Sequence, residues 1–473
     1  MDNKKLSGDY DQNIKCIDKL LRVNESFDMI KKEMVVSGIR IVFYYIDGFV
    51  NSAIMQKLMM HLSTVKDFGD KSETAAKKFA DQYVPAVEVD VSNDIDKISL
   101  AVMSGCSAFL CDGFGANAII IDARTYPARE TSEPENDKVM RGSRDGFVET
   151  LLFNTAMLRR RIRDPKLTIK YFNIGKISKT DIAICYIEGK ADKKYVDYLF
   201  EKFGNINCES IVLGHRSLAE ILIKNKWYNP FPKFRFTERP DAAAASIVEG
   251  SVVVFCDNSP EAIILPTTIF DFLQESDDYY FPPLTGTYLR IVRHLVFWAT
   301  MILTPLWYLL LLYENILPQW LNFIIPQEPG LLPIIVQLFL TEFVLDGLKL
   351  ASLNTPSVLS NSLSVVGGLL LGDFAIQVGW LCPDVILYMA FVSIANFTQS
   401  SYELGYAFKY MRMITLFLTA IFRIWGFFAG IIIALVLIAT NESLDYKKSY
   451  LYPLVPFNGK ALLRLFFRLK KKD

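Results

Sequence analysis

The run "HLVFWATMILTPLWYLLLLY", residues 294–313, is twenty residues long and holds no Lys, Arg, Asp or Glu. A helix of that length crosses the ~30 Å hydrocarbon layer of a bilayer. Charged residues are dense before about residue 290 and sparse afterwards, and hydrophobic residues make up 51% of the chain. We therefore expect a water-soluble α/β half followed by an all-α multi-pass transmembrane bundle.

Five segments of the second half are candidate membrane spans. They are residues 294–313, 331–351, 362–382, 385–398 and 414–440. The loop after the first span has no Lys or Arg and should face outward, whereas Lys409 and Arg412 indicate a cytoplasmic loop before the last span. Since Arg423 interrupts that last span, it is either one crossing or a hairpin or interfacial helix followed by a crossing, which leaves five or six crossings open.

The first residues, "MDNKKLSGDYDQ", have no apolar segment behind their lysines, so we expect no signal peptide and a cytosolic first half. None of the seven cysteines forms a CxxC pair, which favours reduced, buried thiols. Because His61, His215 and His294 are scattered, we expect no metal site and no cofactor.

The first half contains a repeated pattern. A β-branched strand ends at Asp47-Gly48 and is followed by a helical pattern, and the same order recurs around Glu188-Gly189. Further on, Cys111-Asp112 corresponds to Cys256-Asp257, and the separations from the first landmark are 65 and 69 residues. We predict a duplicated α/β unit.

This repeat argues against a nucleotide site. Residues 113–118, "GFGANA", fit the GxGxxA pattern, but a β-type run follows them instead of a helix, so we expect a hairpin. No serine has the surroundings of a hydrolase nucleophile, and we expect no enzyme.

The predicted organisation has six parts. They are an N-terminal helical segment (1–35), a first α/β subdomain (36–126), an Arg-rich helical connector (127–177), a second α/β subdomain (178–285), a transmembrane domain (286–445) and a basic cytoplasmic tail (446–473). The tail suits ordinary positive-inside flanking or binding to anionic membrane lipid.

The connector concentrates arginines. A helix is predicted from about residue 147 to 163, with Asp145 or a neighbour as its cap. Nearby acidic residues disfavour nucleic acid, while a solvated helix end and an ion-paired interface both remain open. The candidate interface residues are Arg141, Arg144, Arg159, Arg160, Arg161 and Arg163.

Three blocks of the sequence resemble the A subunits of GerA-type spore germination proteins. They are "SEPENDKVMRGSRDGFVETLLFNTAMLRRRIRDPKL", "ISKTDIAICYIEG" and "IVEGSVVVFCDNSPEAIILP". The resemblance implies a multi-pass protein of the inner spore membrane with its first half on the cytoplasmic side. It also implies the pore-forming subunit of a homo-oligomeric ring, for which the family suggests a pentamer, with a second multi-pass subunit and other germination proteins as partners. On this reading the arginines pack the two repeats together and dock neighbouring subunits.

The rival functions are a nutrient receptor that binds a small ligand in its soluble lobes and a membrane scaffold.

The segment "SLSVVGGLLLGDFAIQVGW" supplies the candidate pore helix. Helical spacing places one set of residues on a single face, which we expect to line the pore: Ser362, Val366, Leu369, Asp373 and Gln377. Gly368 and Gly372 form a GxxxG pair for close helix packing. Asp373 would favour cations, or it is hydrogen-bonded inside the bundle; Glu342, Asp346 and Lys349 form a second polar stripe whose members could satisfy each other.

Overall fold

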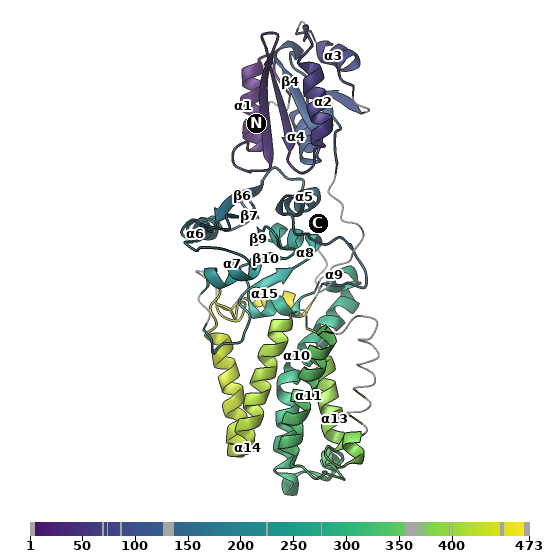
Figure 1. Ribbon diagram of the computed structural model, residues 1–473, viewed down its shortest axis with the longest axis vertical. Coiled ribbons are helices and arrows are strands. Elements are labelled where there is room, and N and C mark those ends of the chain that lie inside the picture. The colour runs from purple at the N-terminus through teal and green to yellow at the C-terminus, as the bar shows by residue number, and fades with distance from the viewer. Residues whose placement is uncertain are drawn as a thin grey trace. The chain divides into compact units, whose positions relative to one another are not determined.

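The structure is a computed structural model, and its chain forms two compact units (Figure 1). It describes residues 5–68, 71–72, 74–85, 88–125, 137–223, 226–275, 277–354, 368, 372, 374–396, 398–399, 401–444 and 449–467. The sheet unit comprises Met1–Lys224 and Phe234–Pro266. The helical unit comprises Asn225–Lys233 and Thr267–Asp473.

Two five-stranded sheets with the same topology form the sheet unit. The first has the order β1-β2-β4-β5-β3 and the second the order β6-β7-β9-β10-β8, and every pairing is antiparallel. The strands of the first are β1 (Met29–Val36), β2 (Ile39–Ile46), β3 (Val89–Ser92), β4 (Ser107–Cys111) and β5 (Ala118–Ile121). Those of the second are β6 (Leu167–Ile174), β7 (Thr180–Ile187), β8 (Arg235–Thr237), β9 (Val252–Cys256) and β10 (Ala262–Leu265).

The helices of the sheet unit follow the strands in matching order. They are α1 (Tyr10–Leu21), α2 (Ser52–Leu62), α3 (Ala75–Tyr83), α4 (Ile95–Met103), α5 (Leu151–Arg161), α6 (Lys193–Gly204), α7 (His215–Leu222) and α8 (Pro240–Val248), with a 3₁₀ turn η1 (Asp112–Phe114). The stretch that fits GxGxxA joins β4 to β5 as a hairpin, as the repeat predicts.

Both sheets begin earlier than the sequence pattern indicates. β1 lies within the segment predicted to be helical (1–35), and β6 lies within the predicted helical connector (127–177). Each is an outer strand whose hydrogen bonds go to β2 or β7, and each alternates buried and exposed residues weakly, so its apolar signal is poor. Ser37 and Gly38, both with positive φ, close the first hairpin in two residues.

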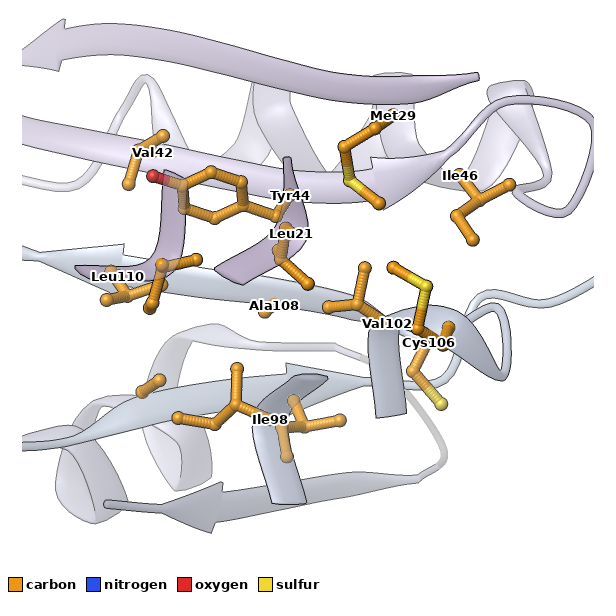
Figure 2. Close-up of a cluster of buried hydrophobic side chains, with 14 of the residues drawn as sticks. Leu21, Met29, Val42, Tyr44, Ile46, Ile98, Val102, Cys106, Ala108 and Leu110 are labelled. Atoms are coloured by element: carbon orange, nitrogen blue, oxygen red, sulfur yellow. The ribbon is translucent and has the colours of Figure 1, made fainter. Parts of the chain in front are cut away.

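One of the two core clusters of the first sheet packs against α1 and α4, and the other packs against α2 and α3. In Figure 2, Val42 and Tyr44 of β2 and Leu110 of β4 extend toward Ile98 and Val102 of α4. These side chains are almost completely buried, and the hydrophobic effect stabilises the lobe in proportion to the area they remove from water.

Helix α5 contributes to one core cluster of each sheet. Ala156 packs in the core of the first sheet, and Leu158 packs in the core of the second. The helix begins at Leu151, four residues later than predicted, because Asn154 binds the backbone of Val148 and holds the preceding segment extended.

The helical unit contains every long apolar helix of the described chain. Its elements are η2 (Ile269–Leu273), α9 (Asp277–Tyr280), α10 (Pro283–Leu311), η3 (Glu314–Ile316), η4 (Gln319–Ile324), α11 (Ile334–Asn354), α13 (Pro383–Asn396), α14 (Tyr402–Ala439) and α15 (Gly459–Phe466). The unit begins at Thr267, earlier than the predicted boundary at residue 286, since Ile269 N donates to Tyr450 O.

Helix α14 is a hairpin. Arg423, with φ of 52°, breaks the helical backbone, and the two arms meet there (Figure 1). A Cβ atom on Gly426 would overlap the backbone of Leu418, and one on Gly430 would overlap Thr415. These two glycines form a GxxxG pair that lets the arms touch, so the backbone here has the form of the predicted hairpin alternative.

Two described helices, Pro283–Leu311 and Tyr402–Ala439, are long and apolar enough to cross a membrane by length and composition. Pro383–Asn396 is a shorter apolar helix. About half of the predicted span at 362–382 lies outside the described residues. The multi-pass bundle with five or six crossings therefore remains a prediction.

Candidate functional site

Four charged side chains pair across α11 and α14. Glu342 and Asp346 lie one turn apart on α11, and Lys409 and Arg412 lie one turn apart on the first arm of α14. Arg412 donates to the Glu342 carboxylate and, through Nη1, to Thr300 O of α10 at 2.9 Å; Lys409 donates to Asp346. Glu342, Lys409 and Arg412 are buried. The cluster thus connects three apolar helices.

This arrangement corrects two predictions. Lys409 and Arg412 do not lie in a loop, because they are inside a helix and face acids of a neighbouring helix. Asp346 pairs with Lys409 of α14, so the polar stripe of α11 is not satisfied within that helix alone; the Lys349 ammonium lies 5.8 Å from the centre of the Tyr406 ring. Sequence spacing reveals pairs within one helix but not pairs between helices sixty residues apart.

Breaking an ion pair of this cluster should cost much of the protein's stability. Removing one partner of a buried ion pair leaves an uncompensated charge and destabilises a protein by ~3–5 kcal/mol. With every group charged, Glu342, Asp346, Lys349, Lys409 and Arg412 carry one net positive charge. Ionisable groups within apolar helices typically mark ion pathways or their gates.

The predicted pore helix is described only in part. Ser362, Val366, Leu369 and Asp373 lie outside the described residues. Gln377 is exposed, and a Cβ atom on Gly368 or Gly372 would meet no described atom within 4 Å. The described chain therefore supplies no partner for this GxxxG pair, and its role in helix packing stays a prediction.

The six connector arginines occupy different environments. Arg159, only 1% exposed, donates twice to Asp28 at 3.0 Å and once to Ser26 Oγ at 3.3 Å. Arg161 pairs with the partly exposed Asp145, while Arg141, Arg144, Arg160 and Arg163 are exposed.

Asp28 precedes β1 of the first sheet and Arg159 belongs to α5, so this pair links the two lobes of the sheet unit. No sequence signal pointed to Asp28.

A second buried cluster, missed in the sequence, lies where α10 begins. Asp278 is completely buried and accepts from Arg290 Nε at 3.1 Å and from Arg293 Nη1 at 2.9 Å. Arg293 also donates to Glu275 at 2.8 Å. These pairs tie the start of α10 to α9 and to the link between η2 and α9.

Three neighbouring side chains in the second lobe, Ser259, His215 and Glu261, are of the residue types found in a hydrolase triad. His215 Nδ1 is within hydrogen-bond reach of Ser259 Oγ, and its Nε2 lies 2.7 Å from Glu261. Ser259 is 2% exposed, so its hydroxyl does not face a substrate in this conformation. Burial opposes the ionisation of Glu261, but the hydrogen bond and charge of His215 outweigh it and hold the pKa of Glu261 below its ordinary value.

Two α/β lobes joined to apolar helices with buried ion pairs are typical of a membrane protein with a large water-soluble domain. The chain belongs to the Bacillus/Clostridium GerA spore germination protein family, whose profile matches residues 16–473. This confirms the resemblance found in the sequence.

Two relatives from Bacillus subtilis (strain 168) cover most of the chain. Stage V sporulation protein AF is 37% identical, over 94% of this chain and 90% of its own. The blocks "TEFVLDGLKLASLNTPSVLSNSLSVVGGLLLGDFAIQVGW" and "VILYMAFVSIANFTQSSYELGYAFKYMR" suggest that same branch, and the comparison agrees. Spore germination protein KA is 28% identical, over 94% of this chain and 82% of its own. The crystal structure of the N-terminal domain of the A subunit of the Bacillus megaterium spore germinant receptor GerK3 matches 55% of this chain and 95% of its own, with 25% identity and a TM-score of 0.41.

Proposed function

We propose that this chain is the pore-forming or ion-release subunit of an oligomeric channel that acts in spore germination. Family membership supports the germination role. Two helices able to cross a bilayer support a place in the membrane. The observation that carries the ion-conducting role is the buried cluster of Glu342, Asp346, Lys409 and Arg412, because charges are retained among apolar helices where they serve ions or gating.

The cluster would act as a latch between helices. Arg412 binds an acid of α11 and a backbone carbonyl of α10, so separating α11 from α14 exposes unpaired charge. Such a two-state contact can hold a pore closed until the helices move. The expected trigger acts from outside the cluster, through partner subunits.

The proposed assembly is a homo-oligomeric ring in the inner spore membrane, with a pentamer as the proposed stoichiometry. A second multi-pass subunit and other germination proteins are its proposed partners, with the sheet unit on the cytoplasmic side. In this ring Ser362, Val366, Leu369, Asp373 and Gln377 would line the pore, with Val366 and Leu369 as the apolar constriction. The exposed arginines of the connector would contact neighbouring subunits, with Arg144 as an example. No catalytic step is part of the proposal.

A receptor role is the second candidate, and one observation favours it. A groove of about 500 Å³ on the first lobe is bordered by β1, β2 and α2. Met34, Met55 and Met59 supply apolar, adaptable walls, and Asp47 and Gln56 supply polar groups. A small ligand with an apolar body and a cationic group would suit it.

Ion release from germinating spores tests the leading proposal. Spores that carry the Glu342→Gln or the Arg412→Gln variant in place of the parent chain should release ions at an altered rate, because the latch is broken. The matched control is Glu314→Gln, which changes an exposed acid in η3. Unaltered release from both cluster variants, at normal protein abundance, would contradict the channel role of the cluster. A defect restricted to the response to nutrient, with normal ion conduction, would favour the receptor role.

A further inference from the structure

Segment 226–233 connects α7 to β8, yet it packs in the helical unit. Asn229 Nδ2 donates to Leu437 O near the end of α14 at 3.0 Å. Phe231 is buried against Phe408, with ring centres 5.7 Å apart. The segment is therefore fixed at the end of the helical unit where α14 finishes.

The outer side of this segment is aromatic. Trp227 is 95% exposed, and Tyr228 is also exposed. Lys226 pairs with Glu442, three residues after the end of α14, at 2.9 Å. A tryptophan ring almost fully open to water is costly, so its exposure calls for an apolar partner.

The C-terminal segment 449–467 packs at the same end. Tyr450 donates to Pro232 O at 2.7 Å, and Leu465 enters the core that holds Phe231. The ring of Phe466 lies 4.8 Å from that of His294 in α10. On the outer side, Phe457 and Leu463 are 74% and 57% exposed.

The end of α14 indicates at what depth of a bilayer these side chains would lie. The second arm of this helix has no charged residue from Ile424 to Ala439, after which Thr440, Asn441 and Glu442 follow. A membrane-crossing helix leaves the hydrocarbon at such a transition, and Trp and Tyr rings gather at that depth. Short amphipathic helices can lie in the plane of the same interface, and α15 is a short amphipathic helix.

We propose that Trp227, Tyr228, Phe457, Leu463 and Phe467 form an interfacial collar that inserts into the headgroup region of an anionic phospholipid bilayer. Lys460, exposed beside the collar, complements anionic headgroups. The proposal rests on the membrane location assigned above but not on ion conduction. Because segment 226–233 links α7 to β8 of the second lobe, the collar includes a loop of that lobe's chain.

Nitroxide accessibility in liposomes tests the collar. The full chain, with Cys16 and Cys208 changed to Ser to remove the two cysteines that are not buried, would receive Trp227→Cys, Phe457→Cys or Leu463→Cys separately. Each labelled chain would be placed in liposomes of phosphatidylcholine and phosphatidylglycerol. Val212→Cys is the control, since Val212 is exposed on the sheet unit.

The collar labels should be relaxed by oxygen and shielded from a water-soluble nickel chelate, whereas the control should show the reverse. Chelate access at the collar equal to that of the control would overturn the proposal. Shielding from both reagents, with dipolar broadening between labelled chains, would overturn it in favour of a contact between copies. Because three separate positions are read, a variant that fails to fold leaves the others to decide, and ion flux plays no part in the readout.

Discussion

Two arginines two residues apart show how environment decides the worth of a charge. Arg159 and Asp28 are both buried and share two hydrogen bonds. Arg161 and Asp145 are both partly exposed to water. Exposed pairs contribute about 0–1 kcal/mol, whereas losing one member of a buried pair costs ~3–5 kcal/mol.

We expect Arg159→Gln to destabilise the protein by ~3–5 kcal/mol, since Asp28 would stay buried without its cation. Arg161→Gln is the matched control and should change stability by about 1 kcal/mol or less. Thermal unfolding of the detergent-solubilised protein measures both. Equal effects of the two changes would mean that the buried pair carries no special role.

The environment of Glu261, beside His215, predicts that the stability of the folded protein depends on pH. The pKa of Glu261 in the folded protein is below its ordinary 4.5, so its ionised form stabilises the fold. That contribution is complete above about pH 4.5 and is lost as pH falls through the lower, folded pKa. Thermal unfolding should be measured at pH 7 and below pH 4.5. Between these two pH values, Glu261→Gln should lose less stability than the parent protein. The control is Glu220→Gln, which changes an exposed acid on α7 and should lose as much stability as the parent protein. An equal loss of stability in all three proteins would contradict the prediction.

The α14 hairpin depends on two glycines rather than on its apolar content. Its arms approach so closely at Gly426 and Gly430 that no side chain fits, and Arg423 forms the bend. Hydropathy alone reads these residues as one long span, because the break is a single residue in an otherwise helical pattern. The same reading missed that Lys409 faces Asp346.

Gly430→Val should prevent the arms from packing, because overfilled contacts cost at least ~1–3 kcal/mol and Thr415 cannot move without its helix. Gly347→Ala on α11 is the control, since a Cβ atom there meets nothing within 4 Å. The yield of monodisperse protein in detergent is the measurement. Equal yields from both variants would show that the arms need no close contact.

The sheet unit shows how far sequence predicts the whole molecule. The repeat was visible because Gly48 and Gly189, both with positive φ, close equivalent turns after β2 and β7. The outer strands were missed because β1 and β6 lack a strong apolar alternation. The charged clusters were missed because Asp28, Asp278 and Glu342 find their partners only through the fold.

A fragment of residues 1–266 should fold without the helical unit, because each sheet has its own buried core. Segment 226–233 should then lack its packing partners, since Leu437 and Phe408 are absent. Hydrogen exchange should find protected strands and rapid exchange in that segment. Rapid exchange throughout both sheets would contradict independent folding.

Ion flux through the purified chain in liposomes, with and without a second multi-pass subunit, tests the channel proposal most directly. The proposal predicts cation flux that Asp373→Asn makes less selective, because the carboxylate is lost from the pore, and a leak in Val366→Ala or Leu369→Ala, because the constriction widens. No flux under either condition, together with unchanged behaviour of these variants, would contradict the assignment of this chain as a pore-forming subunit.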